Sequence, residues 1–163
     1  MTFDESQYRR GYSVGVGGVV LCDGKVLLVQ RALGERRGDW AIPGGFVERG
    51  ETADVAVRRE VLEEAGVVAE VVGLMAARSR VIGSGVENSA YLVFLLRATH
   101  LQAQPDGFEV TAARFFTLDE VQALSPLQGL SHIVVTRALQ GRAHVLKLQP
   151  HPEFPPHDYI LYV

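Results

Sequence analysis

The segment from Gly45 to Val67 reads GFVERGETADVAVRREVLEEAGV and joins a glycine-containing loop to a helix with two unlike faces. Each residue of an α-helix turns the chain by about 100°, so Glu60, Glu63 and Glu64 fan across one arc of its surface. The far side carries an apolar stripe made of Val55, Val61, Leu62 and Ala65. We therefore expect one face to anchor the helix on a core and the other to remain rich in carboxylates.

The rest of the chain alternates apolar runs with turn signals. Val14–Cys22 and Lys25–Gln30 are β-branched runs separated by Asp23-Gly24, a strong signal for a two-residue hairpin. A polar loop is expected over 31–39 and a Gly- and Ser-rich loop over 82–88. Further strands are predicted at Trp40–Ile42, Ala69–Ala77, Ala90–Ala98 and Val110–Phe116, and helices at Leu118–Leu124 and Leu130–Leu139. This order favours an α/β fold in which a mixed sheet lies between helical layers.

The spacing of residues in the first segment resembles the Nudix box of the Nudix hydrolase family. The matching positions are Gly45, Glu51, Arg59, Glu60, Glu63, Glu64 and Gly66, with apolar Val61 and Val67 among them. The resemblance covers roughly residues 12 to 140. It implies a Nudix-type α/β/α sandwich with a mixed β-sheet, in agreement with the order of the predicted elements.

Three acids on one strip of a helix repel one another and need a compensating charge. A divalent cation supplies it, since Mg²⁺ takes oxygen ligands and is commonly held by carboxylates together with substrate phosphates. The resemblance implies Mg²⁺ as cofactor, with Mn²⁺ able to substitute, held by Glu60, Glu63, Glu64 and a backbone carbonyl of Gly45. The alternative for such a pattern is a solvated acidic face.

The resemblance also assigns catalytic roles. It implies that Arg59 pairs with Glu51 and so orients the neighbouring acids, and that the reaction is hydrolysis of a pyrophosphate linkage. Glu63 is the first candidate for the base that orients water. Glu109 is the candidate for an acid from outside the box, and Glu87 is its rival.

Substrate residues are less sharply indicated. Guanidinium groups suit bidentate contacts with phosphate oxygens, and the candidates are Arg31, Arg36, Arg37, Arg78 and Arg80. Trp40 is a candidate for stacking on a base, although a tryptophan at a strand edge is more often part of a core. ADP-ribose or a similar sugar nucleotide is the expected substrate. Two alternatives stay open, namely hydrolysis of oxidised nucleoside triphosphates and a non-catalytic, nucleotide-binding or regulatory Nudix-fold protein.

Composition limits the partners and the compartment. The net charge of −3 and a pI of about 5.9 give no basic footprint for a nucleic acid polymer or an anionic membrane. No apolar run approaches the roughly 20 residues of a membrane helix, so a cytoplasmic protein is expected. Residues 1–143 are expected to form a single domain. The Pro- and aromatic-rich tail 144–163 is expected to pack on it or on a partner subunit, in a protein that the family resemblance implies is a homodimer.

Overall fold

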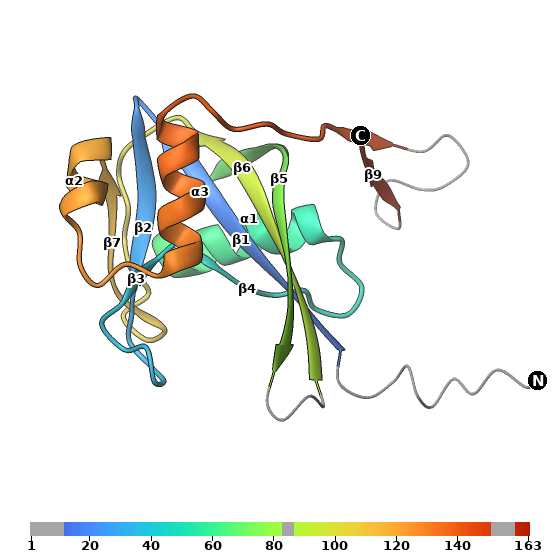
Figure 1. The fold of residues 1–163 in the computed structure, drawn as a ribbon, viewed down its shortest axis with the longest axis horizontal. Helices are drawn as coiled ribbons and strands as arrows, with labels where there is room; N and C mark the ends of the chain where they lie inside the picture. The colour runs from blue at the N-terminus through green and yellow to red at the C-terminus, as the bar shows by residue number, and fades with distance from the viewer. Residues whose placement is uncertain (1–11, 83–86, 151–158) are drawn as a thin grey trace, which may run out of the picture.

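The computed structural model describes residues 12–82, 87–150 and 159–163 (Figure 1). Its strands are β1 Tyr12–Cys22, β2 Lys25–Arg31, β3 Trp40–Ala41, β4 Gly44–Phe46, β5 Ala69–Ile82, β6 Glu87–Ala98, β7 Val110–Phe116, β8 Leu148–Pro150 and β9 Ile160–Tyr162. Its helices are α1 Ala53–Ala65, α2 Leu118–Ala123 and α3 Gly129–Leu139.

The main sheet is mixed and centres on β1. The strand order is β3-β2-β1-β6-β5, with β4 also paired to β1 and β7 to β2. Strands β1 and β6 run parallel over their whole shared length, and the other pairs are antiparallel. Figure 1 shows α3 in front of this sheet and α1 behind it. The sheet therefore has helices on both faces.

Successive side chains of a strand point to opposite faces of the sheet, so the central strands contribute alternate residues to two separate hydrophobic cores. On β2, Leu27 and Val29 pack beneath α1, whereas Val26 and Leu28 pack beneath α3. Helix α1 contributes Val57 and Val61 to the first core, and α3 contributes Val134 and Val135 to the second. The predicted α/β/α sandwich with a mixed sheet is confirmed.

The predicted hairpin and the predicted end of α1 follow from local backbone chemistry. Asp23 and Gly24 both have positive φ, at 47° and 72°, and Cys22 pairs directly with Lys25. This is the conformation that a two-residue Asp-Gly hairpin requires. Helix α1 ends at Gly66, which takes the left-handed conformation with φ of 64° and donates its N–H to the Leu62 carbonyl.

The buried face of α1 differs from the predicted one. Val61 and Ala65 are buried as expected, but Val55 and Leu62 are exposed. The three acids also differ in exposure, because the carboxylates of Glu60 and Glu64 lie on the buried side of the helix whereas Glu63 is exposed. The physical reason is spacing, because Glu60 follows the core residue Val57 by three positions and Glu64 follows Val61 by three, which puts each acid near the buried side of the helix.

Strands β5 and β6 are longer than predicted, and β4, β8 and β9 were not predicted as strands. Strands β5 and β6 pair from Ala69↔Ala98 to Ile82↔Glu87, with register shifts at Val71/Gly73 and Leu74/Ala76. Residues 83–86 of the predicted loop lie outside the described residues. Strand β4 was not predicted, since its three residues contain two glycines and have no strand signal of their own.

The described parts of the C-terminal tail pack on the same chain. Leu146 exchanges both backbone hydrogen bonds with Leu74 of β5, at 2.9 Å each, and β8 pairs with β9. The Tyr162 ring lies edge-on to Phe94 of the core, with centroids 5.5 Å apart. Residues 151–158 lie outside the described residues, and contact of the tail with a partner subunit stays a prediction. Among the described residues, no helix is long and apolar enough to cross a bilayer.

Candidate active site

Strand pairing brings the glycine loop against the acidic helix. Strand β4 lies antiparallel to the first half of β1, with Gly45 opposite Val16 and Gly44 opposite Gly17. A Cβ on Gly45 would lie 2.6 Å from the carboxyl carbon of Glu60, closer than real contacts allow. The loop backbone therefore passes directly over the Glu60 carboxylate, and a methyl group at position 45 would push that side chain aside.

Glu60 and Glu64 are buried beside this loop. Each is less than a tenth exposed, and the Gly44 N–H donates to Oε2 of Glu64 at 2.9 Å. Burial raises the pKa of Glu64 to about 8; the Gly44 hydrogen bond opposes this rise and the Glu60 and Glu109 charges add to it. Burial also raises the pKa of Glu60, against the opposing effect of Arg59. Two adjacent carboxylates held out of water in this way favour a bound cation.

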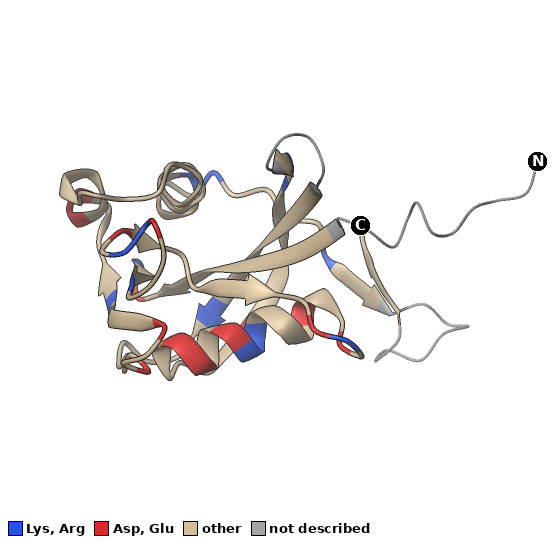
Figure 2. Ribbon diagram, turned by 90° about the horizontal axis from the view of Figure 1, so that it is seen from below, with Lys and Arg blue, Asp and Glu red and all other residues tan. Residues whose placement is uncertain are grey.

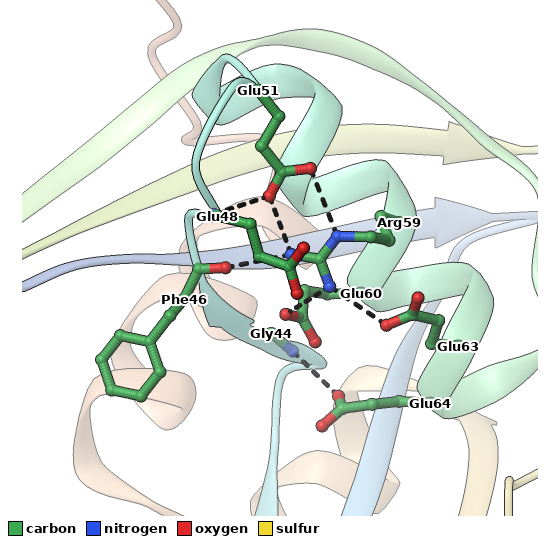
Figure 3. Close-up of polar contacts among 8 residues, drawn as sticks. All are labelled: Gly44, Phe46, Glu48, Glu51, Arg59, Glu60, Glu63 and Glu64. Carbon is green, nitrogen blue, oxygen red and sulfur yellow. Dashed lines mark hydrogen bonds and ion pairs between the residues drawn. The ribbon is translucent and has the colours of Figure 1, made fainter.

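Arg59 is the hub of the polar network, as Figure 3 shows. Its Nε and Nη2 donate to the two carboxylate oxygens of Glu51, at 3.2 and 2.8 Å. Its Nη1 donates to Glu60 at 2.9 Å and to Glu63 at 3.0 Å, and its Nη2 also donates to the Phe46 carbonyl. The predicted pairing of Arg59 with Glu51 is thus present, together with bonds that tie the loop and two further acids to the same guanidinium.

Electrostatics within this network fix the charge of its members. The hydrogen bond from Arg59 holds the pKa of Glu51 below its ordinary value, and the same bond raises the pKa of Arg59. Glu51 also accepts from the Glu48 N–H at 2.9 Å. Glu51 therefore stays ionised and pins the guanidinium that in turn contacts Glu60 and Glu63.

The remaining acids differ in setting. The Glu63 side chain is 58% exposed, so that it is open to water while one oxygen stays bonded to Arg59. Glu109 precedes β7 and is exposed, and its carbonyl accepts from the Ala32 N–H at 2.8 Å. The side chain of Glu87 lies outside what the structure describes.

These residues line a cleft with a volume of about 400 Å³, which we call the acidic cleft. Five glutamates border it, with Arg59 and Arg31 among them: Glu48, Glu60, Glu63, Glu64 and Glu109. Figure 2 shows that acidic residues gather along α1, on one face of the sheet.

A second hollow of about 680 Å³, which we call the basic cleft, adjoins the acidic cleft across the glycine loop. Both are lined by Arg31, Ala41, Ile42 and the loop 44–46. The basic cleft adds three arginines and one exposed acid, Glu35, together with Ser89 and Tyr91; the arginines are Arg36, Arg78 and Arg80. A ligand lying across the loop would meet carboxylates at one end and guanidinium groups at the other.

Most of the residues predicted from the sequence line one of these clefts, but three described ones do not. One of the three is Glu51, which is joined to the acidic cleft through its hydrogen bonds with Arg59. Trp40 packs edge-on against Phe116, at 4.9 Å between ring centroids, and does not line either cleft. Arg37 is exposed and is likewise absent from the described lining of both. Tyr91 was not predicted. Its position becomes visible only through the parallel pairing of β1 with β6, which places it opposite Gly15.

The donor set suits a hard divalent cation. Among the residues that the structure describes, no three His, Cys, Asp or Glu side chains are already arranged as a complete metal site. The two buried carboxylates of Glu60 and Glu64 lie beside the loop backbone at Gly45 and Gly44. One or two carboxylates supplemented by waters and substrate oxygens are the usual environment of Mg²⁺, so this set fits the ion.

Comparison with known proteins agrees with this architecture. The family described as NUDIX domain matches residues 11–138. The ADP-ribose pyrophosphatase of Methanocaldococcus jannaschii is 36% identical over 115 residues, which cover 69% of this chain and 66% of that protein. The 8-oxo-dGDP phosphatase NUDT18 of Mus musculus is 46% identical over 56 residues, covering 34% of this chain and 17% of that protein. The crystal structure of a NUDIX hydrolase from Nitrosomonas europaea has a TM-score of 0.69 and 29% identity, and the match covers 82% of this chain and 73% of that one. This chain thus spans less than two thirds of the length of both curated relatives.

Proposed function

Because the chain belongs to the Nudix hydrolase family, we propose that it hydrolyses the pyrophosphate linkage of a nucleoside diphosphate joined to another group. The substrate class proposed is ADP-ribose or a similar sugar nucleotide. The observation that carries the proposal is the pair of buried carboxylates, Glu60 and Glu64, facing a glycine loop at the floor of a cleft. The archaeal relative named as an ADP-ribose pyrophosphatase supports the choice of substrate.

The residues that would hold Mg²⁺, or Mn²⁺ in its place, are Glu60, Glu64 and the backbone carbonyl of Gly45. When bound, such an ion offsets the negative charge that develops on the phosphoryl oxygens during phosphoryl transfer. Glu63 is a further candidate ligand of the ion, and this role is an alternative to its role as the base. The raised pKa of Glu64 supports this assignment, because a carboxylate that is costly to ionise alone gains most from a cation.

The chain itself supplies orientation and a proton acceptor. Arg59 holds Glu60 and Glu63 through one nitrogen, so both carboxylates keep fixed directions at the cleft. The second oxygen of Glu63 is open to water, and we assign to it the removal of the proton from the attacking water molecule. Glu109, on the other side of the acidic cleft, is the alternative base.

A second candidate activity is hydrolysis of oxidised nucleoside diphosphates or triphosphates. The match to the mouse 8-oxo-dGDP phosphatase favours it, although that match covers only 56 residues. Both candidate activities need the same acids, so the chemistry of the acidic cleft is common to them. They differ in the part of the substrate that lies beyond these acids.

The test is a substrate panel with Mg²⁺ that contains ADP-ribose, a second sugar nucleotide, dGTP and 8-oxo-dGTP, with products separated by chromatography. We expect ADP-ribose to give AMP and ribose 5-phosphate. Glu64→Gln and Glu63→Gln should each lower turnover by a factor on the order of 10² or more. The matched control is Glu70→Gln, which removes an exposed acid of β5 that borders neither the acidic nor the basic cleft.

Three results would count against the proposal. Full activity of Glu64→Gln would remove the role of the buried carboxylate. A clear preference for 8-oxo-dGTP would favour the second candidate. No turnover of any compound, with tight nucleotide binding retained, would favour a non-catalytic binding protein.

A further inference from the structure

Arg78 is an unusual cation in the basic cleft. Arg31, Arg36 and Arg80 are exposed there, whereas Arg78 is half-buried. Its side chain donates one hydrogen bond, from Nη2 to the Ser89 hydroxyl at 3.3 Å, and its Nε is buried without a partner. Among the described residues, no carboxylate lies within ion-pair distance of it. Burial of a guanidinium without a counter-ion is costly, so this side chain calls for an anion.

Arg59 offers a direct comparison within the same protein. Its guanidinium is bonded to three carboxylates and one carbonyl, so its donors are already satisfied. Arg78 is also half-buried, and among the described residues its hydrogen-bond partner is the neutral Ser89 hydroxyl. The difference indicates that Arg59 has a structural role in joining the loop to α1, whereas Arg78 has N–H donors available for a ligand.

Tyr91 fixes the position of Arg78. The Arg78 Cζ lies 5.1 Å from the centre of the Tyr91 ring, within the range of a cation–π contact. Three glycines make room for that ring. A Cβ would lie 2.6 Å from ring carbon Cδ2 if placed on Gly15, and 2.5 and 2.7 Å from the hydroxyl if placed on Gly17 and Gly44. The ring is thus set into the backbone of β1 and β4, and it offers a rigid base for the guanidinium.

We propose that Arg78, seated on Tyr91, forms a preformed subsite for a phosphoryl oxyanion at the basic cleft. A planar guanidinium matches two phosphate oxygens at once, and stacking on a fixed ring lowers the entropy lost when it binds them. Arg31, which lines both clefts, and Arg80 at the rim add positive potential around the same point.

The subsite deepens the proposed function and rests on it for the identity of the substrate. The two clefts share the loop 44–46, and we therefore extend the proposal to a phosphoanhydride that lies across this loop, with one phosphoryl group at the acids and another at Arg78. A phosphate monoester should occupy the Arg78 subsite alone and bind more weakly.

Binding in EDTA tests the subsite without any hydrolysis. Calorimetric titration with ADP, AMP and adenosine measures the phosphoryl contribution, and Arg78→Met keeps an apolar stem over Tyr91 while removing the charge. We expect Arg78→Met to weaken ADP binding by a factor of about 10 or more and to leave adenosine binding unchanged. Arg78→Lys, which keeps the charge but not the planar fork, should give an intermediate loss. The control is Arg97→Met, which removes an exposed arginine of β6 outside both clefts and should change ADP binding less than twofold.

The positioning role of Tyr91 has its own readout. Tyr91→Phe keeps the ring beneath the guanidinium and should retain ADP affinity, whereas Tyr91→Leu removes the ring and should reproduce the loss seen with Arg78→Met. Circular dichroism of Tyr91→Leu checks that the sheet still forms. If that variant does not fold, Arg78→Met and Tyr91→Phe still decide the proposal.

Equal weakening of ADP and adenosine by Arg78→Met, or equal loss in Arg97→Met, would overturn the subsite. Failure of the subsite and failure of the hydrolase activity are distinguishable. Turnover of ADP-ribose with unchanged KM in Arg78→Met rejects the subsite alone. Loss of ADP affinity in a protein that hydrolyses no compound keeps the subsite and rejects the activity.

Discussion

Replacement of Glu64 by glutamine should make the metal-free protein less sensitive to rising pH. Burial raises the pKa of Glu64 to about 8 from its ordinary value of 4.5, so between these pH values the folded protein keeps a proton that the unfolded chain has lost. A state that binds more protons is disfavoured as pH rises, and the carboxyl therefore lowers the free energy of unfolding across this window. Glu64→Gln stays neutral and retains an oxygen for the Gly44 N–H, so it should not show this loss.

The magnitude follows from the width of the window. At about 1.4 kcal/mol per pH unit, the largest loss in the free energy of unfolding that Glu64 can cause is roughly 5 kcal/mol. Relaxation of the site and entry of water reduce the expected loss to about 1 to 3 kcal/mol. The comparison is made within each protein between two pH values, because fixed packing differences between carboxyl and amide then cancel.

The assay is urea unfolding in EDTA at pH 5.0 and pH 8.5, followed by circular dichroism. Between pH 5.0 and pH 8.5 the free energy of unfolding should fall by about 1 to 3 kcal/mol more in wild type than in Glu64→Gln. Glu70→Gln, at an exposed acid, should follow wild type. Mg²⁺ at 100 times its dissociation constant should then restore about 2.7 kcal/mol to wild type at pH 8.5 and much less to the variant. The same pH dependence in wild type and Glu64→Gln would refute the claim that this carboxyl is held out of water.

Three further outcomes follow from the geometry. Gly45→Ala should abolish Mg²⁺-dependent activity while leaving α-helical content intact, since its methyl group would displace the Glu60 carboxylate; activity and circular dichroism measure the two parts. Arg59→Lys should lower turnover by a factor of about 10 to 100, because lysine cannot make the two-point contact with Glu51, and a KM changed as strongly as kcat would contradict a role in orientation. Asp106→Ala removes the acceptor of three backbone N–H groups in the turn before β7 and should cost about 1 kcal/mol at pH 7. These hydrogen bonds outweigh a slight loss of hydration at this exposed residue and hold the pKa of Asp106 below its ordinary value. Urea unfolding should therefore show the difference from wild type shrinking as pH falls below about 3.8.

Local chemistry explains what could be predicted from the sequence. Asp23-Gly24 can hardly form anything but a tight hairpin turn, because two consecutive positive φ angles are needed there and both residues accept them. The end of α1 at Gly66 has the same basis. The acids of the box were predicted to lie together because helix periodicity alone relates Glu60 to Glu64.

Features that depend on distant partners could not be predicted in this way. The sequence period of α1 does not reveal where the sheet edge lies, and for this reason Val55 and Leu62 were wrongly assigned to the core. Strand β4 forms because its backbone pairs with the first half of β1, whereas β2 pairs with the end of β1. Tyr91 carries no motif, and its seat depends on Gly15 across a parallel pairing of strands far apart in the sequence.

Arg59 in the acidic cleft and Arg78 in the basic cleft explain how one site can bind both a cation and an anion. Arg59 neutralises part of the acidic cleft permanently, which limits the repulsion among Glu60, Glu63 and Glu64 when no cation is bound. It does not neutralise Glu64, whose protein hydrogen bond comes from a backbone N–H, so that acid retains the greatest need for a cation. Arg78 has the opposite deficit, because no carboxylate of the described residues reaches it. A phosphoanhydride carrying a divalent cation satisfies both deficits together, whereas either component alone satisfies only one. Binding of the cation and of the phosphorylated compound should therefore be cooperative, with each raising the affinity for the other by the same factor.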